Sequence, residues 1–494
     1  MREFDTIKDS LEPFFRRLPA VKRPEGHVHF KKKLGWTVGI LVLYFALSNV
    51  PLFGMSPESI DLFAGYRAFF AGSYGSLMLL GIGPIVTASI VLQLLVGSKV
   101  IDLDLSDPKD QAFFQGAQKF LVFVMIALEA LPQLMGGFIK PDLNLAATLE
   151  VGVNIIILIL FIQIFIGGVL VLFMDEIVSK WGIGSGVGLF IVAGVSQSII
   201  TGLFNWKIVE GIPVGLIPTW IFFFSQGAEQ LLNSGLMFIL VDGKILALIT
   251  TAAIFLMVVY VESTRIEVPL AHAAVRGARG RFPVKLIYAS VLPMILVRAL
   301  QANIQMMGMV LYQRGFTALG EFQGSTAVSG LMYYLSPLHS PHDWIPSLAA
   351  ANFANLGVPP PETWQIFLRV ATDATMLIVG GMIFALFWIE TTGMGAKNVA
   401  ESIHRTGMQI PGFRRSTGSI EKVMQRYIPK VTIIGGAFIG LLTLIASLMG
   451  TLGDAGGTGL LLTVSIVYRL YEDLASEQLM EMHPMLRKFI GASE

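Results

Sequence analysis

The run GVNIIILILFIQIFIGGVLVLFM, residues 152–174, decides the fold class. It contains no charged side chain, and a helix of about 20 apolar residues is enough to cross a bilayer. The whole chain of 494 residues shares this character, with 54% hydrophobic residues, 14% charged residues and a mean hydropathy of +0.69. Soluble proteins carry about 25% charged residues. The sequence therefore predicts an all-α polytopic membrane protein.

Ten stretches are long and apolar enough to be transmembrane helices. They lie at about 34–53, 76–97, 118–138, 152–174, 184–203, 245–263, 285–310, 366–389, 429–450 and 457–471. A long polar stretch at 204–244 separates five spans from five. An odd number of spans makes the second half enter the membrane from the opposite side, so we expect two inverted five-helix halves.

The distribution of basic residues predicts the orientation. Most of the 35 Lys and Arg residues fall before the first span, in alternate connections and after the last span. The opposite side holds Arg67, Lys140, Lys207, Lys244 and Arg314. By the positive-inside rule, both termini are cytoplasmic, and we expect a multi-pass protein of the plasma membrane.

The spans divide the chain into predicted regions. These are a cytoplasmic amphipathic segment at 1–33, a first half at 34–205, an external hinge loop at 206–244, a second half at 245–471 and a cytoplasmic tail at 472–494. The second half contains cytoplasmic loops at 265–284 and 391–428. Because charge-rich residues precede the first apolar run, we expect no cleaved signal peptide.

The first region has helical periodicity. Its apolar residues recur every three to four positions among charged ones, at Phe4, Ile7, Leu11, Phe14, Phe15 and Leu18. This pattern predicts either an interfacial helix on the cytoplasmic membrane surface or a helix that binds a partner.

Enzymatic chemistry finds little support in the sequence. The chain contains no Cys and no HExxH motif, and His339 and His342 lie in a loop rich in Ser and Pro. The glycine run at 182–188 has Leu189 where a dinucleotide-binding motif needs its third Gly. We therefore expect no catalytic residues, metal or cofactor.

Four charged residues lie at membrane depth: Glu129, Arg298, Arg369 and Asp373. Arg369 and Asp373 are spaced i,i+4, which predicts an ion pair on one helix face. Such residues also mark ion pathways in transporters, although they are scarce here. An ion-coupled secondary transporter is therefore the alternative function.

The second span is broken by Gly81, Gly83 and Pro84, and a modestly apolar segment at 58–75 precedes it. Non-helical backbone at membrane depth is stable only inside protein or against an aqueous cavity. The pattern predicts a short re-entrant helix near Asp61 to Ala71 that could serve as a plug, with an ordinary external loop as the alternative.

The two largest cytoplasmic loops are rich in Arg. Gly277, Gly280, Pro283, Pro411 and Gly412 divide them into expected turns. Arg side chains on ordered turns suit a phosphate-rich partner such as ribosomal RNA, but the same charges could serve only to set the topology. The pattern leaves both interpretations open.

Taken together, several motifs resemble those of SecY-type protein-conducting channels, in their archaeal and eukaryotic branch. The similar stretches occur in the expected order over nearly the whole chain: Leu80–Thr87, Gln93–Leu95, Asp175–Gly186, Phe282–Lys285, Ala302–Asn303, Gly412–Arg414, Arg426–Pro429, Gly457–Gly459 and Thr463–Tyr468. The resemblance implies the pore-forming subunit of a protein translocon, which conducts polypeptides passively and releases hydrophobic segments into lipid.

The resemblance also implies roles for particular residues. The narrowest part of the pore would be a ring of aliphatic side chains: Ile82, Val86, Val187, Ile191, Ile295 and Leu462. The plug would include Asp61, Leu62, Phe63, Tyr66, Arg67 and Phe70. Thr87 and Asn303 would meet at a lateral gate, and Arg276, Arg414 and Arg415 would contact the ribosome.

The implied partners are a SecE-like clamp subunit, a small beta subunit, a translating ribosome, signal peptides with their nascent chains, and membrane lipids. Two features depart from the family pattern. Arg298 places a charge within the seventh span, and the external segment at 311–365 is long and rich in Ser, Pro and aromatic residues. We expect that segment to form an external cap or a partner surface.

Overall fold

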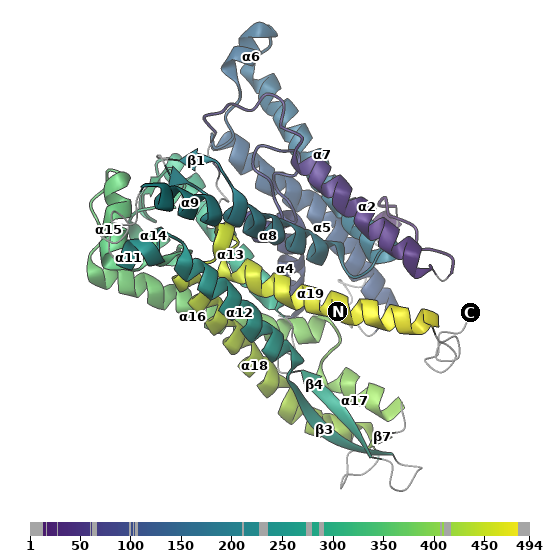
Figure 1. Cartoon of the computed structure of the whole chain (residues 1–494). Coiled ribbons are helices and arrows are strands. Elements are labelled where there is room, and N and C mark those ends of the chain that lie inside the picture. The colour runs from purple at the N-terminus through teal and green to yellow at the C-terminus, as the bar shows by residue number, and fades with distance from the viewer. Residues whose placement is uncertain are drawn as a thin grey trace.

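The computed structural model describes residues 13–482 (Figure 1). Excepted from this range are residues 16, 27, 60, 62–66, 98–99, 102, 104–106, 210–211, 227–235, 273–278, 286–290, 406–407 and 410–415. The statements below concern the described residues.

Each of the ten expected spans contains a long helix. These helices are α2 (Phe30–Ser48), α4 (Gly83–Gly97), α5 (Pro108–Met135), α7 (Val153–Trp181), α8 (Gly186–Phe204), α12 (Ile245–Ser263), α13 (Leu292–Gln313), α16 (Thr363–Thr391), α18 (Thr417–Met449) and α19 (Gly457–Met482). Within the described part of the chain, seven of them are long and apolar enough to cross a membrane, and α4 is a shorter apolar helix.

Helix ends follow local chemistry more closely than hydropathy. Helix α5 begins ten residues earlier than expected, because Pro108 suits a first helical position and the Asp107 side chain accepts a hydrogen bond from the Lys109 amide. Helix α4 begins later than expected. The preceding Gly81 has φ +56°, a conformation that ends regular helix for most residues.

Glycines bring two spans into close contact. A Cβ atom on Gly381 of α16 would lie 2.7 Å from the Gly436 carbonyl oxygen of α18, and one on Gly440 would lie 2.5 Å from the Leu377 carbonyl oxygen. Small residues allow membrane helices to approach at backbone distance, where van der Waals packing is strong. Helices α16 and α18 therefore form a tight pair in the second half.

The two connections expected to be cytoplasmic form a small sheet that was not expected from the sequence. Strands β3 (Arg265–His272) and β4 (Arg279–Lys285) pair antiparallel, and β7 (Met408–Gln409) adds to β3. The turns expected at Gly280 and Pro283 are wrong, since both residues lie within β4. Pro283 is tolerated there because β4 is an edge strand.

The hinge loop is also more ordered than expected. It contains β1 (Ile208–Val209), β2 (Ile212–Pro213), α9 (Leu216–Gln226) and α11 (Leu236–Leu240). Helix α9 within this stretch is an apolar helix.

The segment expected as an external cap contains its own short elements. These are β5 (Phe322–Gln323), β6 (Thr326–Ala327), α14 (Gly330–Leu335), the 3-10 turn η2 (Pro341–Asp343) and α15 (Pro346–Asn355). Phe322, Ala327 and Met332 pack with Phe138 and Met309 in a separate apolar cluster. This cluster attaches the segment to α13 and to the end of α5.

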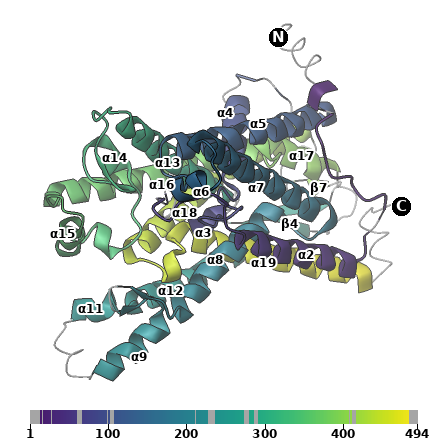
Figure 2. The same cartoon turned by 90° about the horizontal axis from the view of Figure 1, so that it is seen from above.

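The bundle has two distinct ends. Helices α9, α11, α14 and α15 gather at one end, whereas the sheet and α17 (Ala396–Arg405) lie at the other (Figures 1 and 2). Three short elements complete the fold: α3 (Arg67–Phe70), α6 (Leu143–Thr148) and the 3-10 turn η3 (Leu452–Asp454).

The N-terminal segment is described from residue 13 onward. The Phe15 ring lies 5.3 Å from Phe113, and the Phe14 ring lies 5.5 Å from Phe120, both on α5. This part of the segment therefore packs on the protein, while Phe4, Ile7 and Leu11 lie outside the described residues.

Candidate functional site: the channel and its gate

The aliphatic ring residues come from four helices. Ile82 directly precedes α4, Val86 lies within it, Val187 and Ile191 lie on α8, Ile295 on α13 and Leu462 on α19. All but Val187 are buried, and Val187 packs against the same cluster that contains the other five. The fold thus brings residues from both halves of the chain into one apolar core.

A cavity opens toward this core on the side of the β3 to β4 hairpin. It has a volume of about 250 Å³ and is lined by Ser185, Leu292, Leu462, Arg469 and Asp473, among others. Its lining mixes polar and charged side chains with apolar ones, and Leu462 is the ring residue that it reaches. The cavity therefore leads to the apolar ring.

Helix α3 lies against the ring helices α8 and α19. The Ile82 amide donates a hydrogen bond of 2.8 Å to the Phe70 carbonyl oxygen, which ties the end of α3 to a ring residue. Gly81 makes this approach possible, because a Cβ atom there would lie 2.2 Å from the same oxygen. Residues 67–70 therefore occupy the place expected for a plug.

Arg67 holds the base of α3. Its Nε donates to both Asp61 carboxylate oxygens at 3.1 and 3.0 Å, and its Nη1 donates to the Leu79 carbonyl oxygen. The guanidinium also lies 5.6 Å from the centre of the Tyr74 ring, whose hydroxyl pKa is raised by partial burial. Leu62, Phe63 and Tyr66 lie outside the described residues.

Tyr44 is a plug contact that the sequence analysis missed. Its hydroxyl donates a 2.7 Å hydrogen bond to the Ala71 carbonyl oxygen, directly after α3. Its ring stacks on Phe190 of α8 with a centroid distance of 5.0 Å. A single Tyr in an apolar span gives no pattern that would reveal this role.

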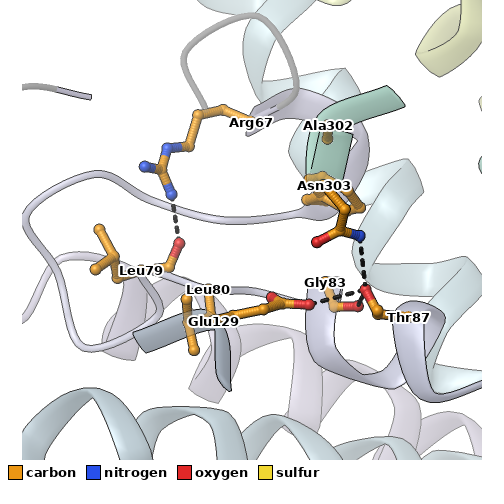
Figure 3. A pocket seen from close by; sticks show the side chains of 9 residues that line it. Arg67, Leu79, Leu80, Gly83, Thr87, Glu129, Ala302 and Asn303 are labelled. Atoms are coloured by element: carbon orange, nitrogen blue, oxygen red, sulfur yellow. Dashed lines mark hydrogen bonds between the residues drawn. The ribbon is translucent and has the colours of Figure 1, made fainter. Parts of the chain in front are cut away.

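Thr87 and Asn303 meet as expected, and Glu129 joins them (Figure 3). The Asn303 amide donates to the Thr87 hydroxyl at 3.4 Å, and that hydroxyl donates to the Glu129 carboxylate at 2.8 Å. Helices α4, α5 and α13 therefore share one polar contact in an apolar surrounding.

A small cavity of about 10 Å³ lies among these gate residues, Arg67 and Phe70 (Figure 3). This space is close to the minimum that holds one water molecule. Arg67 and Phe70 thus line the same space as Thr87 and Asn303.

Asp373 pairs with Arg298 of α13, and the ion pair expected between Arg369 and Asp373 is wrong. Arg298 Nη1 lies 3.2 Å from Asp373 Oδ1, and Arg369 instead lies 3.8 Å from Asp343. The i,i+4 spacing would allow Arg369 and Asp373 to meet along α16. The guanidinium of Arg298 on the neighbouring helix α13 contacts Asp373 instead.

The Arg298 guanidinium has further partners on three helices. It donates to Gln301 at 2.8 Å, to Thr458 of α19 at 3.1 Å and to Ser447 of α18 at 3.1 Å. Gln301 also donates to Asp373 at 2.9 Å. This network satisfies a buried charge at membrane depth and ties α13 to α16, α18 and α19.

The docking residues Arg276, Arg414 and Arg415 lie outside the described residues. The strands near them are described, and the pairing of β3 with β7 joins the two loops that carry these residues. Glu472 of α19 holds the base of the hairpin, with Arg265 at 3.0 Å and Lys285 at 2.6 Å. In the described part of the chain, no group of three or more His, Cys, Asp or Glu residues could hold a metal ion.

A multi-pass helical bundle with an apolar core, a cavity that reaches this core and a polar contact between α4 and α13 has the features of a membrane channel. Comparisons with known proteins agree. Residues 76–471 match the SecY family, and residues 42–75 match the family described as the plug domain of Sec61p. The chain belongs to the SecY family.

Relatives and solved structures cover nearly the whole chain. The protein translocase subunit SecY of Archaeoglobus fulgidus is 61% identical over 491 residues, which are 99% of each chain. The solved structure described as that of a protein conducting channel has a TM-score of 0.78 at 38% identity and covers 96% of this chain and 98% of its own.

Sec61 in the canine ribosome-channel complex from the endoplasmic reticulum has a TM-score of 0.75 at 38% identity, with the same coverage. These findings confirm the expected fold class and the function as the pore-forming subunit of a protein translocon. They do not favour the alternative of an ion-coupled transporter.

Proposed function

We propose that polypeptides pass through this chain along the aliphatic ring and that α3 closes the ring at rest. The observation that carries this proposal is the contact of α3 with α8 and α19, together with the hydrogen bond from Ile82 to Phe70. A peptide entering from the cytoplasmic cavity would meet Leu462 and the other ring residues before it displaces α3.

The chemistry of the ring suits a channel that must accept many sequences. Aliphatic side chains offer water no hydrogen bonds, so a narrow ring resists filling by water and ions. The same side chains can move apart around a chain of any sequence, because they make no specific polar contacts with it. The pore is therefore passive, and we propose that a translating ribosome drives the movement.

The lateral gate would open between α4 and α13. Hydrogen bonds between membrane helices contribute about 0.6 kcal/mol on average, so the long contact between Thr87 and Asn303 holds the gate weakly. A hydrophobic signal that enters this seam gains by burying apolar surface in lipid. Glu129 of α5 accepts the Thr87 hydrogen bond on the α4 side of the seam, so it would orient the Thr87 hydroxyl and would not itself bridge the gate.

The two ends of the bundle support the proposed orientation. The basic hairpin, α17 and the end of α19 would face the cytoplasm, and α14 and α15 would face outward (Figure 1). Arg276, Arg414 and Arg415 would then contact ribosomal RNA. A SecE-like clamp subunit, a small beta subunit, signal peptides and lipids complete the proposed partners, in the plasma membrane.

Site-specific photocrosslinking tests the pore and the gate together. A photoreactive residue is placed at Ile191 or at Thr87, and the complex is loaded with a stalled ribosome that carries a signal-bearing nascent chain. A matched control at Ile162 lies on the exposed surface of α7. We expect the nascent chain to crosslink at Ile191 and the signal to crosslink at Thr87. Neither the nascent chain nor the signal should crosslink at Ile162. Ribosome binding without crosslinks at both test positions would contradict the proposed path.

A further inference from the structure

Helix α9 begins beside the end of a membrane span. The Gly215 amide donates a 2.8 Å hydrogen bond to the Asn205 carbonyl oxygen, directly after α8 ends at Phe204. The Val214 amide donates to the Lys207 carbonyl oxygen at 2.9 Å. These two bonds fix the start of α9 at the level where α8 ends.

A second pair of bonds joins α9 to the beginning of the next span. The Trp220 indole nitrogen donates a 2.9 Å hydrogen bond to the Gly243 carbonyl oxygen, and the Lys244 ammonium donates to the Val214 carbonyl oxygen at 2.5 Å. Helix α12 starts at Ile245. Helix α9 is therefore held between the ends of the candidate membrane spans α8 and α12.

The two sides of α9 differ in burial. Ile217, Ile221 and Phe224 are 40%, 52% and 66% exposed, and their spacing of four and three places them on one helix face. Thr219 and Phe223 are buried, and α9 contacts α8 and β2. The exposed face is thus bulky and apolar.

Exposed apolar residues also lie at the end of the candidate span α8 and in the connection to α9. Ile200 and Phe204 are exposed on α8, and Trp206 and Ile208 extend the apolar surface toward α9. Residues 216–226, LIPTWIFFFSQ, include no charged side chain. Aromatic and aliphatic residues at span ends are typical of the boundary between lipid headgroups and acyl chains.

We infer that α9 is an interfacial lipid-binding helix that lies along the membrane boundary, with Ile217, Ile221 and Phe224 immersed among acyl chains. The region between the two halves is then held in the membrane and is not free in water. This inference rests on neither the ring nor the lateral gate, and it holds whichever leaflet faces this end of the bundle.

Spin-label accessibility tests the inference in the full chain, purified with its partner subunits in phosphatidylcholine and phosphatidylglycerol vesicles. Because the chain contains no Cys, Ile221→Cys introduces a single labelling site. Ile162→Cys on α7 serves as the lipid-exposed control, and Ser325→Cys in the β5 to β6 connection as the water-exposed control. The measurement is the ratio of collision rates with oxygen, which partitions into acyl chains, and with a water-soluble nickel chelate.

We expect the label at Ile221 to give a ratio several-fold above that at Ser325 and to approach that at Ile162. A ratio equal to that at Ser325 would place α9 in water and overturn the inference. Low collision rates with both reagents would show that protein covers the helix, which also overturns it. Phe224→Cys repeats the measurement on the same face in case one variant fails to fold.

Discussion

Arg298 of α13 and Asp373 of α16 form a buried ion pair of 3.2 Å at membrane depth, on helices that are separated by the whole external segment. The carboxylate also contacts that segment, since the Leu338 amide lies 3.5 Å from its second oxygen. Asp373 thus joins α13 to the segment between α13 and α16.

Removing one charge of this pair should destabilise the protein strongly. Asp373→Asn leaves the Arg298 guanidinium buried without a counter-charge, so we expect a loss of about 3–5 kcal/mol in the free energy of unfolding. Denaturant unfolding in detergent micelles measures this loss, with Glu321→Gln in the exposed external hairpin as the control.

The double variant Arg298→Met with Asp373→Leu should recover most of the loss, because apolar residues of similar volume often replace a buried ion pair without cost. If Asp373→Asn proved as stable as the original chain, the pair would not stabilise the bundle.

Replacing Gly81 should open the plug. The residue has φ +56°, and an added Cβ atom would lie 2.2 Å from the Phe70 carbonyl oxygen, so Gly81→Ala should separate Phe70 from Ile82. We expect an ion leak in planar-bilayer conductance measurements, because α3 would no longer close the ring.

Gly137→Ala is the matched control for this prediction. Gly137 has φ +67°, but a Cβ atom there would meet no atom within 4 Å. It therefore carries similar backbone strain without the clash. Equal conductance in the two variants would mean that strain, and not loss of the contact between Phe70 and Ile82, causes the leak.

An apolar residue at the gate should favour the closed state. In Asn303→Leu the half-buried side chain packs against α4 while the gate is closed, and it would meet the water of the open pore when α13 leaves α4. A difference of about 1.4 kcal/mol would lower the open population about tenfold. We expect weakly hydrophobic signals to be translocated less efficiently in reconstituted vesicles.

Strongly hydrophobic signals serve as the internal control for Asn303→Leu, because their gain from entering lipid exceeds this difference. An equal loss for weak and strong signals would argue for a folding defect. Unchanged translocation of both would show that Asn303 does not set the gating equilibrium.

Glu472 should hold the β3 to β4 hairpin against α19 in a salt-dependent way. Glu472→Gln removes the charge that faces Arg265 and Lys285. Exposed ion pairs contribute about 0–1 kcal/mol each, and screening at about 1 M salt shortens the Debye length to about 3 Å. We expect faster amide exchange in β3 and β4 at low salt, and little difference at high salt.

Glu401→Gln on α17 controls for a change of charge elsewhere on the cytoplasmic side. An exchange difference that persists unchanged at high salt would show that Glu472 acts through packing and not through its charge.

Some features of the fold were predictable because they depend on local sequence. A buried backbone in lipid must satisfy its own hydrogen bonds, so each apolar run, such as 152–174, specifies a helix without reference to its neighbours. Gly81 and Pro84 likewise predicted the break before α4, and the short helix at Arg67–Phe70 lies where the plug was expected. The meeting of Thr87 with Asn303 was expected from the resemblance, and the structure confirms it.

Other features depended on contacts between distant segments. The sequence spacing predicted that Asp373 pairs with Arg369 on its own helix. In the structure Asp373 pairs instead with Arg298 of α13. Glu129 was visible as a lone acid in an apolar span, yet its bond to Thr87 exists only because α5 packs beside α4. The amphipathic placement of α9 also depends on its hydrogen bonds to the ends of α8 and α12.

The sequence by itself therefore determined the membrane class, the positions of ten helices and the break that produces a plug. Tertiary structure decided which polar groups became partners and which apolar face of α9 remained exposed. The physical reason is that hydropathy and helix formation act over a few turns of chain. Pairing of a buried charge depends instead on a distance of about 3 Å between atoms that only packing can bring together.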